Sequence, residues 1–211
     1  MRLAAAVLAM LAISGPMVSS AAAGSGLQQL ESFLDSARSV TASFHQEVLD
    51  GSGEVIESST GRLQLQRPDR FRWDYDDPYE RVVMADGERL WLYEADLSQV
   101  TIRRLDAGLG ETPAALLTGD RRMLERFEVL ASWSGEATQW VRLRPRAGDS
   151  DFESVAIGFS AGKPTQIEFQ DRLGQQTRVR LRDVRLNPSL ELSAFRFTVP
   201  PGVDVIREDE L

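Results

Sequence analysis

The sequence predicts a mainly β protein of the α+β kind, in which about eleven strands form one large antiparallel sheet that curls strongly. Three observations predict this fold. From residue 41 onward, apolar side chains recur with a period of two, which is typical of strands with one buried face. Turn signals such as Asp50-Gly51-Ser52-Gly53 and Asp86-Gly87 divide this pattern into short segments. No linker, repeat or low-complexity segment interrupts it, so the strands are expected to share one domain.

Residues 1–23 have the pattern of a secretory signal peptide. Arg2 supplies the positive charge, residues 3–13 are apolar, and Ala21-Ala22-Ala23 fits the small-residue cleavage rule. The apolar run is too short to span a bilayer, which needs about 20 residues. We therefore expect residues 24–211 to form a single mature domain that is soluble in the periplasm.

The first helix is expected over residues 25–38. Ser25 and Gln28 have the spacing of a capping box, and a cation at Arg38 suits the helix C-terminus. Apolar residues at helical spacing form one narrow stripe along this segment: Leu27, Leu30, Leu34 and Ala37.

Strands follow the first helix. The clearest segment is 71–75, where Phe71, Trp73 and Tyr75 alternate with Arg72 and Asp74, so that three aromatic rings share one face. The expected strands are 41–49, 61–66, 71–75, 82–85, 90–93 and 99–105, and then 129–133, 139–144, 155–159, 166–170, 177–186 and 195–199.

A helical interlude separates the two groups of strands. Thr112 as N-cap and Pro113 at the first position open a short helix that carries Leu116 and Leu117 and ends at Gly119. Asp120 is expected to cap a second short helix with one apolar side: Met123, Leu124 and Phe127.

Two arrangements of these elements fit the pattern. The helices could cover the concave face of a half-closed barrel, or the strands could pair as a sandwich with the helices outside. The narrow apolar stripe on each helix favours a lid over an apolar concave face.

Composition excludes several classes of function. The net charge of −8 argues against nucleic-acid binding. With no Cys and a single His, the sequence has no ligand set for a zinc enzyme and no disulfides, and we expect no cofactor and no metal.

One motif imitates an enzyme. Residues 158–162 match the G-x-S-x-G pattern of α/β-hydrolases around Ser160, but that pattern needs a following helix and a later His. Here Lys163-Pro164 and another strand follow, and His45 lies far upstream. A β-turn is the better interpretation, and we do not expect an enzyme.

Taken together, several motifs resemble the periplasmic outer-membrane lipoprotein carrier family (LolA). The resemblance is carried in order by Arg67-Pro68, Phe71-Arg72-Trp73 and the segment Asp86-Gly87-Glu88-Arg89-Leu90-Trp91. Shorter matches at 42–46, 50–53, 112–113 and 195–203 extend it over nearly the whole mature chain.

The resemblance implies an unclosed β-barrel of about eleven strands, with short helices as a lid over its apolar concave face. It also implies a monomeric chaperone that binds the acyl chains of lipoproteins. It would receive them from the lipoprotein-releasing ABC transporter of the inner membrane and deliver them to an outer-membrane lipoprotein receptor. The absence of a Cys for lipidation disfavours the receptor itself. Two alternatives remain: a lipoprotein-sensing or envelope-stress regulatory protein of the same fold, and a hydrolase that uses Ser160.

The resemblance also implies the site residues. Arg67 would act as a latch whose guanidinium donates to backbone carbonyls of the lid. The acyl-chain cavity would be lined by apolar residues from helices and strands: Leu30, Leu34, Phe71, Trp73, Met84, Trp91, Leu116 and Leu117. From the residues alone, an ordinary hydrophobic core is the simpler interpretation of this set.

Overall fold

A computed structural model describes residues 25–105, 113–118, 121–148, 150 and 152–208. The expected signal peptide, the caps at Thr112 and Asp120, and the helix end at Gly119 lie outside these residues. Within them, no helix is long and apolar enough to cross a membrane.

The described residues form one 12-stranded sheet, which confirms the predicted fold class. The strands are β1 (Ser39–Leu49), β2 (Val55–Gln66), β3 (Arg70–Asp77), β4 (Arg81–Asp86), β5 (Arg89–Glu94), β6 (Gln99–Arg104), β7 (Phe127–Gly135), β8 (Thr138–Pro145), β9 (Phe152–Ser160), β10 (Lys163–Asp171), β11 (Gln176–Leu186) and β12 (Asp204–Arg207). The helical segments are α1 (Gly26–Ser36), α3 (Pro113–Thr118), η2 (Arg121–Arg126) and η3 (Leu192–Phe195).

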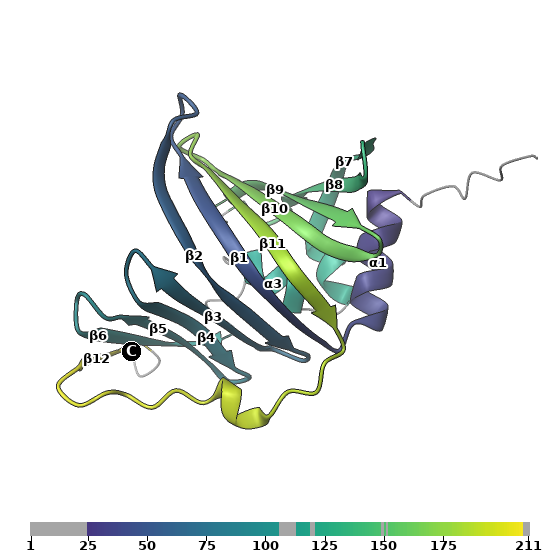
Figure 1. Ribbon diagram of the computed structural model, residues 1–211. Coiled ribbons are helices and arrows are strands. Elements are labelled where there is room, and N and C mark those ends of the chain that lie inside the picture. The colour runs from purple at the N-terminus through teal and green to yellow at the C-terminus, as the bar shows by residue number, and fades with distance from the viewer. Residues whose placement is uncertain (1–24, 106–112, 119–120, 149, 151, 209–211) are drawn as a thin grey trace, which may run out of the picture.

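The sheet is a curled meander with two open edges. Its order is β12-β6-β5-β4-β3-β2-β1-β11-β10-β9-β8-β7, and pairing of β1 with β11 joins the two halves. All pairs are antiparallel except that of β12 with β6, which is parallel. β7 and β12 end the order without pairing to each other, so the barrel is unclosed, and Figure 1 shows the curl.

The first helix begins as its capping box predicts. The Gln28 amide donates to the Ser25 hydroxyl at 3.3 Å, and the Ser25 amide donates to the Gln28 side chain at 2.9 Å. The helix ends at Ser36, two residues before the predicted end, and the Ala37 amide closes its last turn on the Phe33 carbonyl. Leu30 and Leu34 are buried as the apolar stripe predicts.

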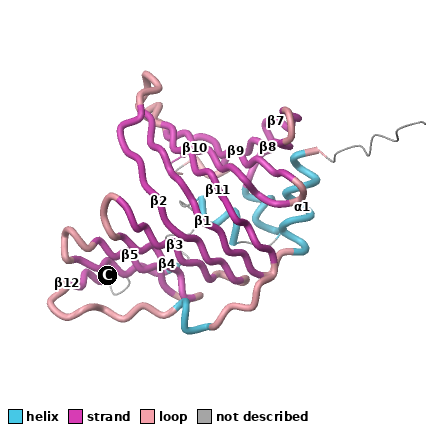
Figure 2. Tube along the Cα trace, viewed as in Figure 1, coloured by secondary structure: helices cyan, strands magenta, loops and turns pink. Residues whose placement is uncertain are grey.

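Helices cover one face of the sheet, which we call the inner face. α1 contacts β7, β8 and β9, whereas α3 contacts β2 and β3. The two helices therefore lie over opposite halves of the curl (Figures 1 and 2). The second predicted middle helix is the 3₁₀ segment η2.

The C-terminal strand prediction was wrong. Residues 196–200 have no regular structure, and η3 occupies Leu192–Phe195. The chain then crosses to the far edge of the sheet, where β12 adds the parallel strand that the sequence did not predict (Figure 1). The ring of Phe197 lies 5.9 Å from that of Trp91 and 5.5 Å from that of Tyr93, so this part of the predicted strand packs on the sheet through its side chain and does not pair with it through its backbone.

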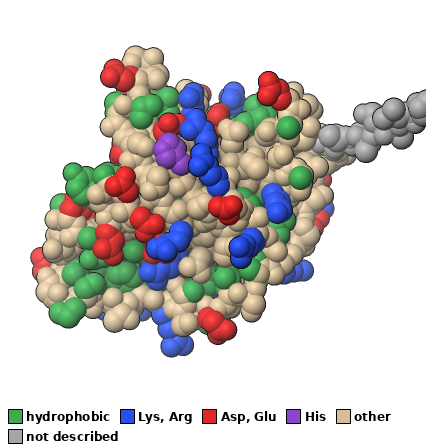
Figure 3. Space-filling view, in the orientation of Figure 1, with side chains coloured by type: hydrophobic (Ala, Val, Ile, Leu, Met, Phe, Trp, Pro, Cys, Tyr) green, Lys and Arg blue, Asp and Glu red, His purple; other side chains and the backbone are tan. Residues whose placement is uncertain are grey.

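The outer face carries a second apolar cluster beneath this C-terminal segment. Its members come from β4, β5, β6 and the segment itself: Val82, Met84, Trp91, Tyr93, Val100, Ile102, Phe195 and Phe197. Figure 3 shows hydrophobic side chains gathered at the lower left of the molecule, in the region of these strands.

Candidate functional site

The inner face carries a continuous apolar cluster that includes six of the eight predicted cavity residues. Each of the six is at most 7% exposed, and they come from three elements: Leu30 and Leu34 of α1, Phe71 and Trp73 of β3, and Leu116 and Leu117 of α3. The spacing of two between Phe71 and Trp73 places both rings on this face, as the sequence predicts.

Two of the predicted cavity residues lie on the other face. Met84 pairs across the strands with Arg72 and with Trp91, and such directly opposed residues share a face. Trp91 donates from its indole nitrogen to Asp86 at 2.8 Å and contacts the ring of Phe197 at 5.9 Å. Met84 and Trp91 therefore belong to the outer cluster, and their assignment to the cavity was wrong.

The sequence contained a signal that identifies the correct residues. The Asp86-Gly87 turn fixes the register in which Ala85 pairs with Leu90, and Ala85 also pairs with Phe71. Leu90 and Leu92, not Trp91, therefore point inward with Phe71.

Aromatic residues that the sequence analysis did not single out extend the inner cluster. The ring of Phe44 on β1 lies 4.9 Å from that of Trp73, and the ring of Phe33 on α1 lies 6.0 Å from that of Phe159. Phe33 falls between the predicted stripe positions of its helix, yet it is only 2% exposed because α1 is buried on a wide face.

Side chains of the helices pack directly against the inner face in this conformation. Leu30, Phe71 and Leu116 are each 0% exposed, so side chains from helix and sheet are in contact along the cluster. An apolar guest that took the place of these helix side chains would require α1 or α3 to move away from the sheet.

One arginine joins both helices to the sheet. Arg67 follows β2, and its backbone amide donates to the Arg38 carbonyl at 2.9 Å. Its Nη1 donates to the carbonyls of Phe33 at 3.2 Å, Leu34 at 2.8 Å and Ala37 at 2.5 Å. Its Nη2 donates to the Leu117 carbonyl at 2.8 Å.

Three of these acceptors are carbonyls at helix ends, those of Leu34, Ala37 and Leu117, and the fourth, the Phe33 carbonyl, also accepts from the Ala37 amide. Carbonyls in the last turn of a helix lack amide donors from within the helix, and a guanidinium meets that need with several N–H groups in one plane. Arg67 also lies 5.0 Å from the centre of the Phe33 ring. The side chain therefore holds α1, α3 and β2 together at one point.

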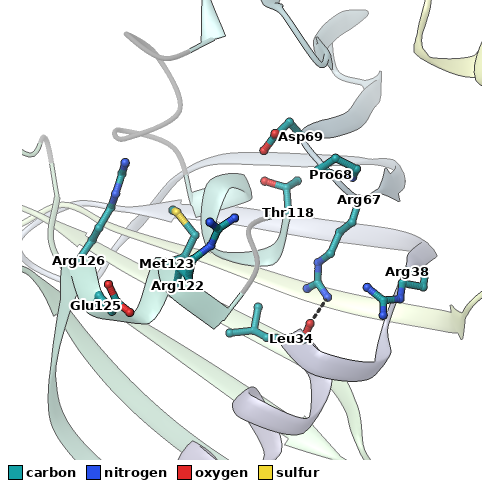
Figure 4. Close-up of a pocket in the computed structure, with 10 residues that line it drawn as sticks. All are labelled: Leu34, Arg38, Arg67, Pro68, Asp69, Thr118, Arg122, Met123, Glu125 and Arg126. Atoms are coloured by element: carbon teal, nitrogen blue, oxygen red, sulfur yellow. Dashed lines mark hydrogen bonds between the residues drawn. The ribbon is translucent and has the colours of Figure 1, made fainter.

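A pocket of about 670 Å³ lies beside this junction. Figure 4 shows its lining and the bond from Arg67 to Leu34. The lining residues come from the end of α1, the turn between β2 and β3, the end of α3, and η2: Leu34, Arg38, Arg67, Pro68, Asp69, Thr118, Arg122, Met123, Glu125 and Arg126.

A tyrosine borders the inner cluster. The Tyr75 ring packs 5.0 Å from Phe44, its hydroxyl donates to the Gln46 side chain at 3.2 Å, and the Arg81 guanidinium lies 4.1 Å from its centre. Burial raises the pKa of Tyr75 above its ordinary value of 10.0 because the phenolate would lose its hydration. The neutral phenol is the form that this site holds.

Ser160 stands in a hairpin, as the turn interpretation predicts. It ends β9 opposite Lys163, and the two residues between them, Ala161 and Gly162, have φ angles of 49° and 77°. No helix follows, and His45 contacts Ser58 instead, at 3.2 Å. In the part of the chain that the structure describes, no group of side chains is suited to hold a metal ion.

Comparison with known proteins gives consistent matches. The family model described as outer membrane lipoprotein carrier protein LolA matches residues 35–198. Proteins named outer-membrane lipoprotein carrier protein are similar to this chain in Halorhodospira halophila (45% identity, covering 87% of this chain and 86% of the relative) and in Nitrosospira multiformis (41%, covering 87% and 89%). The namesake from Cupriavidus necator is 38% identical over 97% of this chain and 96% of its own length. Among solved structures, an uncharacterized conserved protein from Thermus thermophilus shares the fold with a TM-score of 0.52 at 14% identity, covering 86% of this chain and 96% of that one.

Proposed function

The chain belongs to the LolA family of outer membrane lipoprotein carrier proteins, and from this premise we propose that its inner apolar face holds the acyl chains of a lipoprotein in transit. The observation that carries the proposal is the inner cluster itself. It is continuous, it lies beneath two short helices, and a single arginine side chain ties both helices to the sheet. The protein is a carrier of lipoproteins, and this cluster is the surface best suited to acyl chains.

The physical need for such a carrier is large. Each methylene group that leaves water contributes about 0.8 kcal/mol, so acylated protein does not cross an aqueous space unshielded at a useful rate. In the closed conformation the helices occupy the concavity with their own apolar side chains. Acyl chains would replace those side chains against Phe71 and Trp73, which limits the apolar surface exposed to water in either state.

Arg67 would set the balance between the two states. Its bonds to the carbonyls of α1 and α3 exist only while those helices are in place, so they favour the empty, closed form. Opening for cargo would break them, and their return would assist release. No covalent bond is made or broken in this cycle, so we propose binding and gating roles for these residues and no enzymatic role.

We place the cycle in the periplasm, with the lipoprotein-releasing ABC transporter of the inner membrane as donor and an outer-membrane lipoprotein receptor as acceptor. The signal-like segment 1–23 supports this compartment. N-terminal sequencing of protein from the periplasmic fraction should give Gly24 as the first residue. Recovery of the protein from the membrane fraction with Met1 retained would contradict the placement.

The test of function is direct capture. The mature protein is purified from periplasm without detergent, and co-purifying proteins are identified by mass spectrometry that resolves N-terminal acylation. We expect lipoproteins with intact acyl chains, and we expect the same proteins after removal of their acyl groups not to bind. Binding that does not depend on acylation would contradict an acyl-chain site.

A further inference from the structure

The pocket beside the latch has a charge that contrasts with the rest of the chain. Four of its lining residues are arginines, Arg38, Arg67, Arg122 and Arg126, and only Asp69 and Glu125 are acidic. The chain as a whole carries a net charge of −8. A concave site lined mainly by one sign of charge concentrates ions of the opposite sign.

The pocket also lies where the closed form is held together. It is bounded by the C-terminal end of α1, by the turn after β2, by the end of α3 and by η2 (Figure 4). A molecule bound there touches each element that must separate when the helices leave the sheet.

Two of these arginines are not engaged with acids. In the described part of the chain, neither the Arg38 nor the Arg126 side chain forms an ion pair or a hydrogen bond. The neighbouring Arg121 differs, because it bridges to Glu31 at 3.2 Å and to Asp35 at 2.9 Å on α1. The pocket thus offers two guanidinium groups outside any ion pair, one that follows α1 and one on η2, to a ligand.

The latch bonds themselves are open to competition by an anion. All four of the latch bonds run from Arg67 to neutral carbonyls, and its Nη1 faces three of them with two hydrogens. Bonds from the guanidinium to a carbonyl and to an anion are both charge-assisted, but an anion adds the attraction between opposite charges, and phosphate oxygens match the planar fork of donors.

We propose that this pocket is a phosphate-binding site and that a phosphate bound there draws Arg67 away from the helix carbonyls and opens the carrier. The ligand is a phosphate group, supplied either by free phosphate or by a phospholipid headgroup at a membrane surface. The inference rests on the proposed function, since opening matters only if the inner face takes acyl chains. If the phosphate belongs to a phospholipid headgroup, its binding would make the carrier open at the membrane surface, where the lipoprotein is loaded.

The test compares phosphate with chloride at equal ionic strength. Opening is followed by binding of an environment-sensitive apolar dye and by hydrogen exchange of the α1 amides. Wild type is expected to bind more dye and to exchange faster in phosphate. Arg67→Leu is expected to start open and to show no further response.

A pair of double variants separates the pocket from general charge. Arg38→Gln/Arg126→Gln removes two pocket arginines without removing a latch bond, and the half-saturating phosphate concentration should rise about tenfold or more. Arg182→Gln/Arg185→Gln removes the same charge from exposed positions of β11 and should respond as wild type does.

Further arms identify the source of the phosphate. Opening by phosphatidylglycerol vesicles and by soluble glycerophosphoglycerol would support a headgroup as the ligand, whereas opening by inorganic phosphate alone would support the free ion. The proposal is overturned if neither inorganic phosphate nor glycerophosphoglycerol acts more strongly than chloride, or if the pocket variant responds as wild type does. Opening by polyglutamate but not by phosphate would also overturn it, in favour of an acidic polypeptide.

The same preparations are tested for binding of a triacylated lipopeptide. Lipopeptide binding without any phosphate response defeats this inference and leaves the proposed function intact. Failure to bind the lipopeptide at all defeats the proposed function instead.

Discussion

Replacing Arg67 with leucine removes the only side chain that bonds both α1 and α3 to the strand side of the molecule, among the hydrogen bonds described. Nη1 has two hydrogens and faces three carbonyls, so two of its bonds are complete at a time, and Nη2 adds one more. Water replaces the guanidinium when the helices leave, and the net contribution of each bond from a charged group is about 1.5–3 kcal/mol. Three such bonds should cost the closed form about 4.5 kcal/mol or more relative to the open form, which is a factor of about 2000 or more in their ratio.

The assay is a two-step transfer that separates loading from release. Arg67→Leu should load lipoprotein from inner-membrane vesicles as wild type does, retain it more tightly, and deliver it slowly to a purified acceptor. Arg67→Lys should show a partial defect, because one ammonium group does not reproduce the planar fork of donors.

The control is Arg62→Leu, on β2, the strand that Arg67 follows. Arg62 pairs with Asp76 at 3.1 Å, but both side chains are more than half exposed, so the pair contributes little. If Arg67→Leu released cargo as fast as wild type and bound no more apolar dye, the four bonds would be static surface contacts and the latch would be refuted.

Three further predictions follow from packing and burial. Gly26→Ala should lower the free energy of unfolding by about 1–3 kcal/mol and increase dye binding, because the added Cβ would lie 2.0 Å from the Trp140 carbonyl oxygen and displace α1 from the sheet. Met84→Ala should cost about 2–5 kcal/mol in urea unfolding yet leave lipopeptide affinity unchanged, whereas Trp73→Ala should weaken that affinity. Tyr75 should add a fall in stability above pH 10, because the phenol ionises there in the unfolded chain but stays protonated in the folded one, where its pKa is raised; Tyr75→Phe should flatten that fall.

Each of these has a matched control. Gly135→Ala places its Cβ no closer than 3.9 Å to its nearest neighbours and should leave stability unchanged. Tyr79→Phe should leave the fall in stability above pH 10 unchanged, because the Tyr79 side chain is 66% exposed. Loss of lipopeptide affinity in Met84→Ala, measured on folded protein, would show that the outer cluster takes part in binding.

The sequence predicted α1 and β3 well, because both are determined by interactions between neighbouring residues. The capping box and the apolar stripe located α1 to within two residues, because a cap and a periodic face are properties of neighbouring residues. Alternation in residues 71–75 likewise identified β3 and its buried aromatic face.

The predictions that were wrong concern features set by strand register and by residues that are distant in the sequence. Met84 and Trp91 were assigned inward on their apolar character, yet hairpin register turns them outward, where Phe197 covers Trp91. Residues 195–199 have the alternation of a strand, but the chain forms its last pairing later, at β12. Neither the pairing of β12 with β6 nor the composition of the outer cluster can be predicted from a few neighbouring residues, because both depend on residues far apart in the sequence.

The carbonyl partners of Arg67 lie beyond any local pattern. They belong to α1, about 30 residues earlier, and to α3, 50 residues later. Only the resemblance to the carrier family pointed to helix carbonyls as its acceptors.

The four tryptophans of the chain allow the central claim to be measured directly. Single-tryptophan variants retain either Trp73, on the inner face, or Trp91, on the outer face, with the other tryptophans replaced by phenylalanine. Each is loaded with a lipopeptide whose acyl chains carry bromine, which quenches indole fluorescence on close contact. Acyl chains held on the inner face should quench Trp73 strongly and leave Trp91 unchanged. Equal quenching of both, or quenching of Trp91 alone, would contradict the account.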